Sequence, residues 1–183
     1  MRDNIPPSVL RELLKYDPET GVFTWVVRPE SRFLHPKQAK VWNKKYGNKR
    51  AFQHVNARGY LVSKIYGKAY QAHRVAWAIT YGKWPADCID HINGDPSDNR
   101  LGNLREATVR QNSLNSRSPR GTSKYKGVFW LSSGQKWAAA IKVHGKQTRL
   151  GSFQDEDDAA RSYNQAASKL FGDFAWLNEV NDG

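Results

Sequence analysis

The segment of residues 88–112, CIDHINGDPSDNRLGNLREATVRQN, constrains the fold more than any other part of the chain. Two short runs that suit β-strands, CIDHI and LREAT, enclose a loop dominated by the turn formers Asn, Asp, Gly and Pro. After the second run, Thr108 and Gln111 match the N-cap and N3 positions of a capping box. The segment therefore predicts a strand, a loop, a second strand and a short helix.

Three side chains of this segment form a set that suits metal-assisted cutting of a phosphodiester bond. Such cutting needs an activated water and a cation that stabilises the leaving oxygen. His91 can act as a general base near neutral pH, while Asp90 and Asn112 offer the oxygen ligands that hard cations prefer. Adjacent residues of a flat strand point to opposite faces, so Asp90 and His91 share a site only if the strand bends or if they flank the scissile phosphate. The competing interpretation is a polar turn without chemistry.

Basic residues gather in two long stretches that contain no acidic residue. The formal net charge is +12, with twelve Lys or Arg between Ser31 and Ala86 and nine between Ala107 and Gln154. Aromatic residues and glycines run through both stretches, which favours folded basic faces over loose tails. We therefore expect a polyanionic partner, nucleic acid first, and the competing explanation is a generically basic soluble protein.

Composition excludes several classes of protein. With 39% hydrophobic and 12% aromatic residues, the chain is expected to fold rather than to remain disordered. No apolar run reaches the roughly 18 to 20 residues of a membrane helix, and the first residues lack the apolar region of a signal peptide. Cys88 is the single cysteine, which excludes an intramolecular disulfide and a Cys-based zinc site. The expected compartment is a reducing one.

In the N-terminal half, the hydrophobic pattern predicts a helix over 9–16 and a strand over 22–27. Residues 30–50 are basic and show no clear period, so they are expected to be irregular. A hairpin is expected over 59–73, and a helix over 73–82 that ends near a glycine.

In the C-terminal half, Ser, Pro, Gly and basic residues predict a linker over 116–122. Three strands are expected over 125–131, 136–144 and 147–153, followed by a helix that starts near Asp155. The second strand alternates well, and one of its faces carries Trp137, Ala139, Ile141 and Val143.

Residues from about 72 to 115 resemble the HNH endonuclease family, specifically its phage and intron-homing branch. The resemblance rests on DHINGD, the triplets DNR and NLR, and QN. It implies a ββα-metal (His-Me finger) nuclease in which His91 is the general base and Asp90 and Asn112 bind one Mg²⁺ or Mn²⁺. It also implies that Asn103 braces the loop and orients the base, and that the products carry 5′-phosphate and 3′-hydroxyl ends.

Residues 123–178 resemble the AP2 (ERF-type) DNA-binding domain through YKGV, KWAAAI, RLGSF, the following helix and the closing LN. That family packs a three-stranded antiparallel sheet on one helix and lays the sheet in the major groove. The resemblance implies DNA-facing sheet positions for Lys126, Lys142 and Arg149. The chain departs from plant members at four positions, so their GC-rich target is not assumed: Phe129, Leu131, Ala140 and Arg149.

Other polar residues near the motif carry weaker expectations. Four arginines are candidates for phosphate contacts, and each could equally be a solvated surface charge: Arg74, Arg100, Arg105 and Arg110. His73 is expected to be structural or to contact phosphate rather than to be catalytic. Four residues of the loop are expected to be turn formers rather than ligands: Asn93, Asp95, Asp98 and Asn99.

Together these observations predict an α+β protein: an N-terminal region over 1–115 with a nuclease core at about 72–115, the linker, and an AP2-like domain over 123–180. The expected function is metal-dependent cutting of double-stranded DNA at a site that the AP2-like module selects. The basic face across 32–83 would add salt-dependent phosphate contacts.

The expected setting is the cytoplasm of a phage-infected bacterium, with the enzyme a free-standing mobile endonuclease. One site per chain cuts one strand per event, so a monomer would nick and a DNA-assembled dimer could cut both strands. Two rival functions stay open: a non-catalytic, sequence-specific DNA-binding regulator, and an RNA-binding protein.

Overall fold

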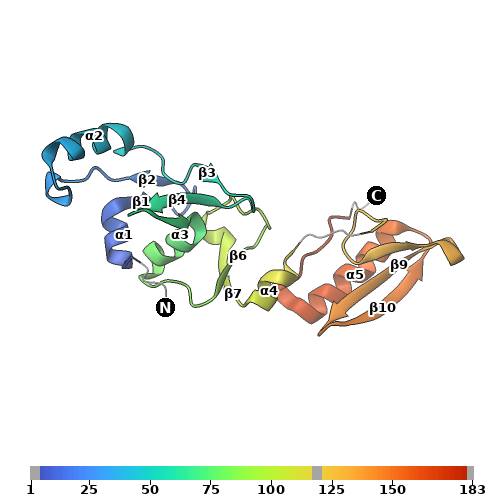
Figure 1. Cartoon of the computed structure of the whole chain (residues 1–183). Helices are drawn as coiled ribbons and strands as arrows, with labels where there is room; N and C mark the ends of the chain where they lie inside the picture. The colour runs from blue at the N-terminus through green and yellow to red at the C-terminus, as the bar shows by residue number, and fades with distance from the viewer. Residues whose placement is uncertain (1–4, 117–120, 181–183) are drawn as a thin grey trace. The chain divides into compact units, whose positions relative to one another are not determined.

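The computed structural model describes residues 5–116 and 121–180. The chain divides into two compact units, Met1–Thr108 and Val109–Gly183, and both combine helices with small antiparallel sheets (Figure 1). Within the described residues, no helix has the length and apolar character needed to cross a membrane. The expected linker, 116–122, lies mostly outside the described residues. The expected domain limits stay a prediction.

The N-terminal unit begins with α1 (Pro7–Leu13) and with the strands β1 (Leu14–Tyr16) and β2 (Phe23–Trp25), which pair antiparallel. The expected helix over 9–16 therefore ends early, because its last residues pair with β2 instead. The expectation of an irregular segment over 30–50 is wrong. A 3₁₀ turn, η1 (Glu30–Arg32), leads into the helix α2 (Pro36–Tyr46), which buries Ala39 and begins with a proline at its first position.

Strands β3 (His54–Val55), β4 (Leu61–Ile65) and β5 (Lys68–Gln71) form a second antiparallel sheet in that order. Tyr66 and Gly67, with φ of 49° and 76°, form the two-residue turn of the expected hairpin. Helix α3 (Ala72–Tyr81) follows at once and ends at Gly82, whose left-handed backbone caps it. The hairpin and this helix are confirmed.

The core of the N-terminal unit lies between α1, β1, β2 and α3. Its fully buried side chains include Leu10, Leu13, Phe23 and Val75. Each such side chain contributes roughly 1.5–3 kcal/mol when it leaves water. This core supports one side of the segment that the sequence singles out.

That segment folds as β6 (Cys88–His91) paired antiparallel with β7 (Leu104–Ala107), with a 3₁₀ turn, η2 (Leu101–Asn103), at the end of the loop between them. Helix α4 (Val109–Leu114) begins the second unit. The expected order of strand, loop, strand and helix is confirmed.

The second unit contains the sheet β10-β9-β8, formed by β8 (Val128–Leu131), β9 (Lys136–Val143) and β10 (Lys146–Phe153). A 3₁₀ turn, η3 (Ser132–Gly134), joins the first two strands. Helix α5 (Glu156–Phe171) follows, and the Asp155 carboxylate caps it by accepting from the backbone N–H groups of Asp157 and Asp158. The turn η4 (Gly172–Phe174) ends it.

One face of this sheet packs on α5. Ala139 and Ile141 of β9 are buried in one cluster with Ala160 and Tyr163 of the helix, as the alternation predicts. A Cβ at Gly127 would stand 2.1 Å from the Tyr163 ring, so only a glycine lets the helix approach this closely. The opposite face of β9 carries Ala138 and Ala140, which are also buried, and the exposed Lys142.

Candidate functional site

His91 ends β6 and is buried, with 5% of its surface exposed. Its Nε2 lies 3.4 Å from the Asn99 Oδ1, and its ring meets the edge of the His73 ring at a centroid distance of 5.0 Å. Tyr60 contacts it from a third side, at 5.9 Å between ring centroids. Burial lowers the pKa of His91, and the Asn99 hydrogen bond and the Asp90 charge offset part of that effect. The imidazole is therefore neutral at pH 7, as a general base must be.

His73 lies in the first turn of α3 and is also buried, at 4% exposed. Its Nδ1 has no hydrogen-bond partner among the described residues. The Tyr60 ring lies 4.9 Å away between centroids. Burial, together with His91 and Arg74, lowers the pKa of His73 to about 3. Tyr60, His73 and His91 thus form a closed aromatic cluster in which both imidazoles stay uncharged.

Asp90 is buried next to His91 but meets a different environment. It stands opposite Arg105 in the β6–β7 register. Its Oδ2 accepts a hydrogen bond from the Arg105 Nε at 2.8 Å and lies 2.7 Å from the Arg105 Nη2 as an ion pair. His91 instead stands opposite Leu104. The alternation of the strand holds, so the carboxylate and the imidazole lie on different sides of β6.

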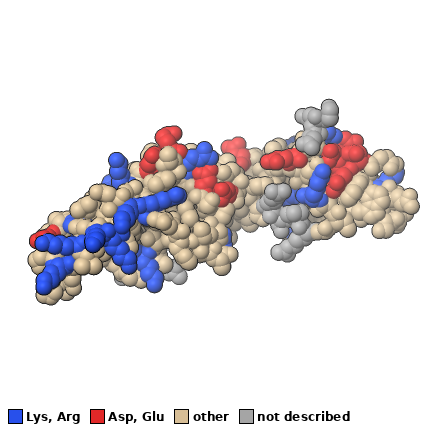
Figure 2. Space-filling view, turned by 90° about the horizontal axis from the view of Figure 1, so that it is seen from above, with Lys and Arg blue, Asp and Glu red and all other residues tan. Residues whose placement is uncertain are grey.

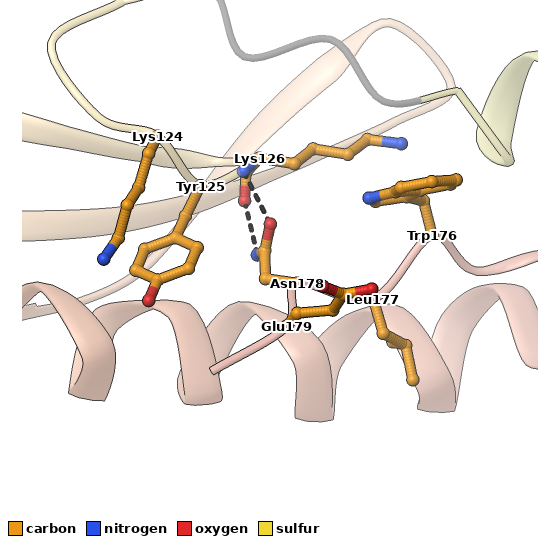
Figure 3. Close-up of a pocket in the computed structure, with 7 residues that line it drawn as sticks. All are labelled: Lys124, Tyr125, Lys126, Trp176, Leu177, Asn178 and Glu179. Atoms are coloured by element: carbon orange, nitrogen blue, oxygen red, sulfur yellow. Dashed lines mark hydrogen bonds between the residues drawn. The ribbon is translucent and has the colours of Figure 1, made fainter. Parts of the chain in front are cut away.

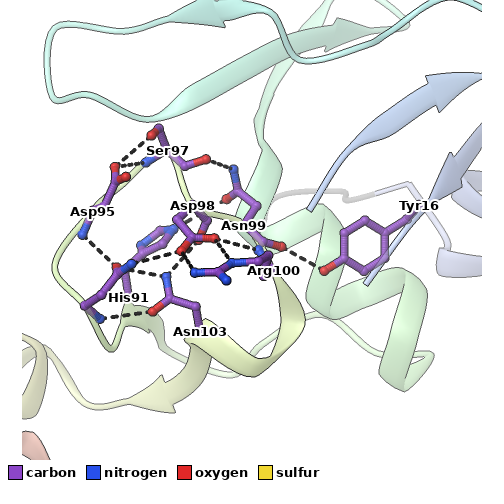
Figure 4. A network of polar contacts seen from close by, with 9 residues as sticks. Tyr16, His91, Asp95, Ser97, Asp98, Asn99, Arg100 and Asn103 are labelled. Atoms are coloured by element: carbon purple, nitrogen blue, oxygen red, sulfur yellow. Dashed lines mark hydrogen bonds and ion pairs between the residues drawn. The ribbon is translucent and has the colours of Figure 1, made fainter. Parts of the chain in front are cut away.

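The loop between β6 and β7 is held by Asn103, which is 8% exposed (Figure 4). Its Oδ1 accepts from the Asn93 backbone N–H at 3.0 Å, and its Nδ2 donates to the Asn93 Oδ1 and the Asp98 carbonyl at 2.9 Å. Arg100 pairs with Asp98 at 2.6 Å, and its hydrogen bonds lower the pKa of Asp98 to about 2. Asn103 therefore braces the loop, and its effect on the base stays a prediction.

Asn99 is the residue of this loop that touches the His91 ring. Its Nδ2 donates to the Ser97 carbonyl at 2.9 Å, and its own carbonyl accepts from the Tyr16 hydroxyl at 2.8 Å. A Cβ at Gly21 would lie 2.6 Å from the backbone of Asn99. The turn after β1 therefore packs directly against this loop. Asn99 was expected to be a turn former. Its contacts with His91 and Tyr16 depend on the tertiary structure, so the local sequence does not indicate them.

Asn112 lies on α4 and is half-buried. It belongs to the second unit, and its place beside Asp90 stays a prediction. Among the described residues, no group of three or more His, Cys, Asp or Glu side chains could hold a metal ion.

Two of the arginines expected near phosphate make contacts within their own units. Arg74 donates to the carbonyls of Asp87 at 2.7 Å and Pro85 at 3.4 Å, which holds the segment before β6. Arg110 on α4 lies 3.1 Å from the His144 Nε2.

Lys126 lies two residues before β8, and its expected contact with DNA stays a prediction. Its Nζ donates to the Leu114 carbonyl at 2.7 Å, and burial lowers its pKa. A cavity of about 170 Å³ adjoins Lys126. There the Asn178 Oδ1 accepts from the Lys126 backbone N–H, and the Asn178 Nδ2 donates to the Lys126 carbonyl (Figure 3).

Lys142 and Arg149 are exposed on the sheet of the second unit. Lys142 pairs directly with Gln147, two residues before Arg149, so the two cations share one face. Ile141 points the other way, into the cluster on α5. The face away from the helix therefore carries both charges.

A model of the HNH endonuclease family matches residues 70–114. An uncharacterised HNH endonuclease of Acanthamoeba polyphaga mimivirus is 36% identical over 130 residues, which cover 70% of this chain and 67% of the relative. The chain belongs to the HNH endonuclease family. It is accordingly a hydrolase that cuts phosphodiester bonds of DNA.

Two further relatives resemble different parts of this HNH endonuclease. Protein 3.8 of Escherichia phage T7 is 33% identical over 114 residues, 61% of this chain and 93% of the phage protein. Dehydration-responsive element-binding protein 2E of rice is 44% identical over 57 residues near the C-terminus, 30% of this chain and 18% of the plant protein. No solved structure matches the chain.

Proposed function

We propose that the enzyme is a metal-dependent endonuclease of double-stranded DNA in which His91 is the general base. The observation that carries this proposal is the buried His91 ring, which lies in the segment that the family model matches and is contacted by Asn99, His73 and Tyr60. A neutral imidazole with a fixed ring can take a proton from a water that attacks a phosphodiester.

The proposed metal ligands are Asp90 and Asn112, and the residues present fit a Mg²⁺-like cation. A carboxylate and an amide supply the hard oxygen donors that Mg²⁺ or Mn²⁺ takes together with waters and substrate phosphate. Both Arg105 contacts fall on the Asp90 Oδ2 and hold that oxygen in place. A bound cation would stabilise the charge that develops on the phosphate and on the leaving 3′ oxygen.

In this proposal β6, β7 and α4 are the ββα-metal unit. The strand alternation that separates Asp90 from His91 then has a use, because a scissile phosphate at the end of β6 could meet the base from one side and the cation from the other. Asn103 acts by holding the loop in place. The proposed nuclease region ends near residue 115.

We propose that the second unit is an AP2-like module that selects the DNA site. Support comes from its three-stranded sheet packed on one helix and from Lys142 and Arg149 on the face away from α5. The likeness to a plant protein whose name describes element binding points the same way. A sheet with exposed cations can lie in a major groove and reach base edges.

The setting we propose is that of a mobile endonuclease of a phage, acting in the host cytoplasm, because two relatives come from viruses. As a single chain with one site it would nick one strand per event. Double-strand cutting would need two chains assembled on the DNA.

Nicking of supercoiled plasmid tests the proposal. We expect cutting by the full chain with Mg²⁺, none with EDTA, and none by His91→Ala. If the wild-type chain binds a target without any metal-dependent cutting, the protein is a DNA-binding regulator instead. If duplex RNA displaces duplex DNA, the expected substrate is wrong.

A further inference from the structure

A cavity of about 700 Å³ opens in the N-terminal unit, away from the aromatic cluster around His91. Its walls come from β2, the end of α2, residues 49–54 and the strands β4 and β5, so nearly all of it lies outside the segment that the family model matches. The buried rings of Trp25 and Phe52 make its interior apolar. Its volume lies within the range of sites that enclose a small organic group, roughly 300–1,000 Å³.

The mouth of this cavity is lined by cations. Lys45, Lys49, Arg50 and Lys64 are all exposed there, and no Asp or Glu lines the cavity. None of the four forms an ion pair within 5–116 and 121–180. Figure 2 shows Lys and Arg side chains gathered on the visible face of this unit. Four uncompensated positive charges around one opening suit a polyanion.

The segment that carries two of these cations is held rigidly. Its backbone is bonded to β2, from the Trp25 N–H to the Lys49 carbonyl at 2.9 Å and from the Ala51 N–H to the Phe23 carbonyl at 2.8 Å. Phe52 follows with φ of 51°, a left-handed conformation that a bulky aromatic residue rarely adopts. Such backbone strain concentrates at ligand-binding sites, where the surrounding structure imposes it.

Tyr46, at the end of α2, adds an accessible aromatic ring to the cavity: it lines the cavity and is 37% exposed. Positive grooves with an accessible aromatic ring bind single strands, since every base can stack on such a ring. In a duplex the bases are stacked inside and cannot enter an apolar cavity. The occupant that fits both features is thus a nucleotide that is not paired.

We propose that this cavity binds an unpaired nucleotide of a DNA strand, with the phosphates at Lys49 and Lys64 and the base against Tyr46. The inference rests on the proposed function, because it assigns the site to the DNA that the nuclease cuts. It adds a contact with the DNA that is separate from the general base His91 and from the AP2-like sheet. The nuclease would favour targets that contain an unstacked nucleotide.

Binding of an oligothymidylate of about 16 nucleotides to the full chain in EDTA tests this proposal, because no cutting occurs there. Each phosphate contact to a single strand adds about 0.7 to the slope of log K against log salt. We therefore expect Lys49→Gln with Lys64→Gln to lower that slope by about 1.4. The matched control, Lys15→Gln with Lys169→Gln, removes two exposed charges that do not line the cavity and should leave the slope unchanged.

Tyr46→Leu tests the stacking contact, with Tyr46→Phe as the variant that keeps the ring. We expect Tyr46→Leu to weaken binding by about 5- to 100-fold, the equivalent of one lost base stack, and Tyr46→Phe to bind as the wild type does. Thermal melting of each variant identifies a loss of fold.

Three results would overturn the proposal: equal slopes for the test pair and the control pair, equal binding by the Leu and Phe variants, or tighter binding of an RNA of equal length. Plasmid nicking by the same variants keeps the two hypotheses apart. Nicking that persists with unchanged slopes rejects the cavity and leaves the nuclease standing.

Discussion

Acid should destabilise the N-terminal unit through His73. Burial lowers the pKa of this histidine from 6.5 to about 3, so the folded unit keeps the ring neutral while the unfolded chain protonates it. The unfolded state then binds more protons throughout that window, and stability falls as the pH falls below the unfolded pKa. His91 acts in the same direction, because burial lowers its pKa as well.

The size of the effect follows from the two pKa values. One unit of difference is about 1.4 kcal/mol, so a drop to about pH 5 should cost roughly 2 kcal/mol through His73 alone. This window lies above the titration of most carboxylates, which separates the histidine effect from general acid denaturation. His73→Phe keeps a ring in the aromatic cluster and removes the titrating group.

Hydrogen exchange of α3 peptides during urea unfolding reports the stability of this unit directly. We expect the wild type to lose at least about 2 kcal/mol between about pH 7 and about pH 5, and His73→Phe to lose roughly 2 kcal/mol less than the wild type does. A wild-type unit that is equally stable at both pH values would refute the buried, neutral His73. So would an undiminished pH dependence in His73→Phe.

Three further predictions concern the loop and the strand pair. Gly21→Ala should destabilise the protein by more than about 1 kcal/mol in chemical unfolding, because its φ of 70° and the contact at 2.6 Å leave no room for a Cβ. The control Gly102→Ala, with open space around it, should be nearly neutral in the same measurement. Arg105→Leu should cost about 3 kcal/mol in the same measurement, because it leaves the Asp90 carboxylate buried beside an apolar side chain; equal stability would show that the pair is dispensable. Asn99→Ala should lower the free energy of unfolding by roughly 1–3 kcal/mol. It should also lower kcat for plasmid nicking without raising KM. A variant that cuts at the wild-type rate would show that Asn99 does not support His91.

The sequence predicts those elements that depend on residues close together along the chain. The turn at Tyr66 and Gly67, the glycine cap of α3 and the alternation of β9 all depend on neighbours along the chain, and each is confirmed. The strand pair β6–β7 follows for the same reason, since a turn-rich loop separates two short β-forming runs.

Helix α2 could not be predicted in this way, because its sequence has almost no apolar face. Only Ala39 is buried, and the half-buried Trp42 ring packs against the Arg28 guanidinium, at 3.8 Å, from a distant part of the chain. Its stability therefore comes from tertiary contacts rather than from helical periodicity.

Asn99 shows the same limit within the site. An asparagine in a loop of turn formers predicts a local turn, and its bond to Ser97 is of that kind. Its contacts with His91 and with the Tyr16 hydroxyl bring together residues that are distant in the sequence. The aromatic cluster of Tyr60, His73 and His91 likewise forms only when three separate elements meet.

The central claim is that His91 is the base of a metal-dependent DNA endonuclease. The most direct measurement is single-turnover nicking of supercoiled plasmid by wild type and by His91→Ala, with Mg²⁺ and with EDTA, alongside a binding assay on the same DNA. We expect Mg²⁺-dependent nicking by wild type, and binding without nicking by His91→Ala. Cutting by His91→Ala at the wild-type rate would contradict this claim.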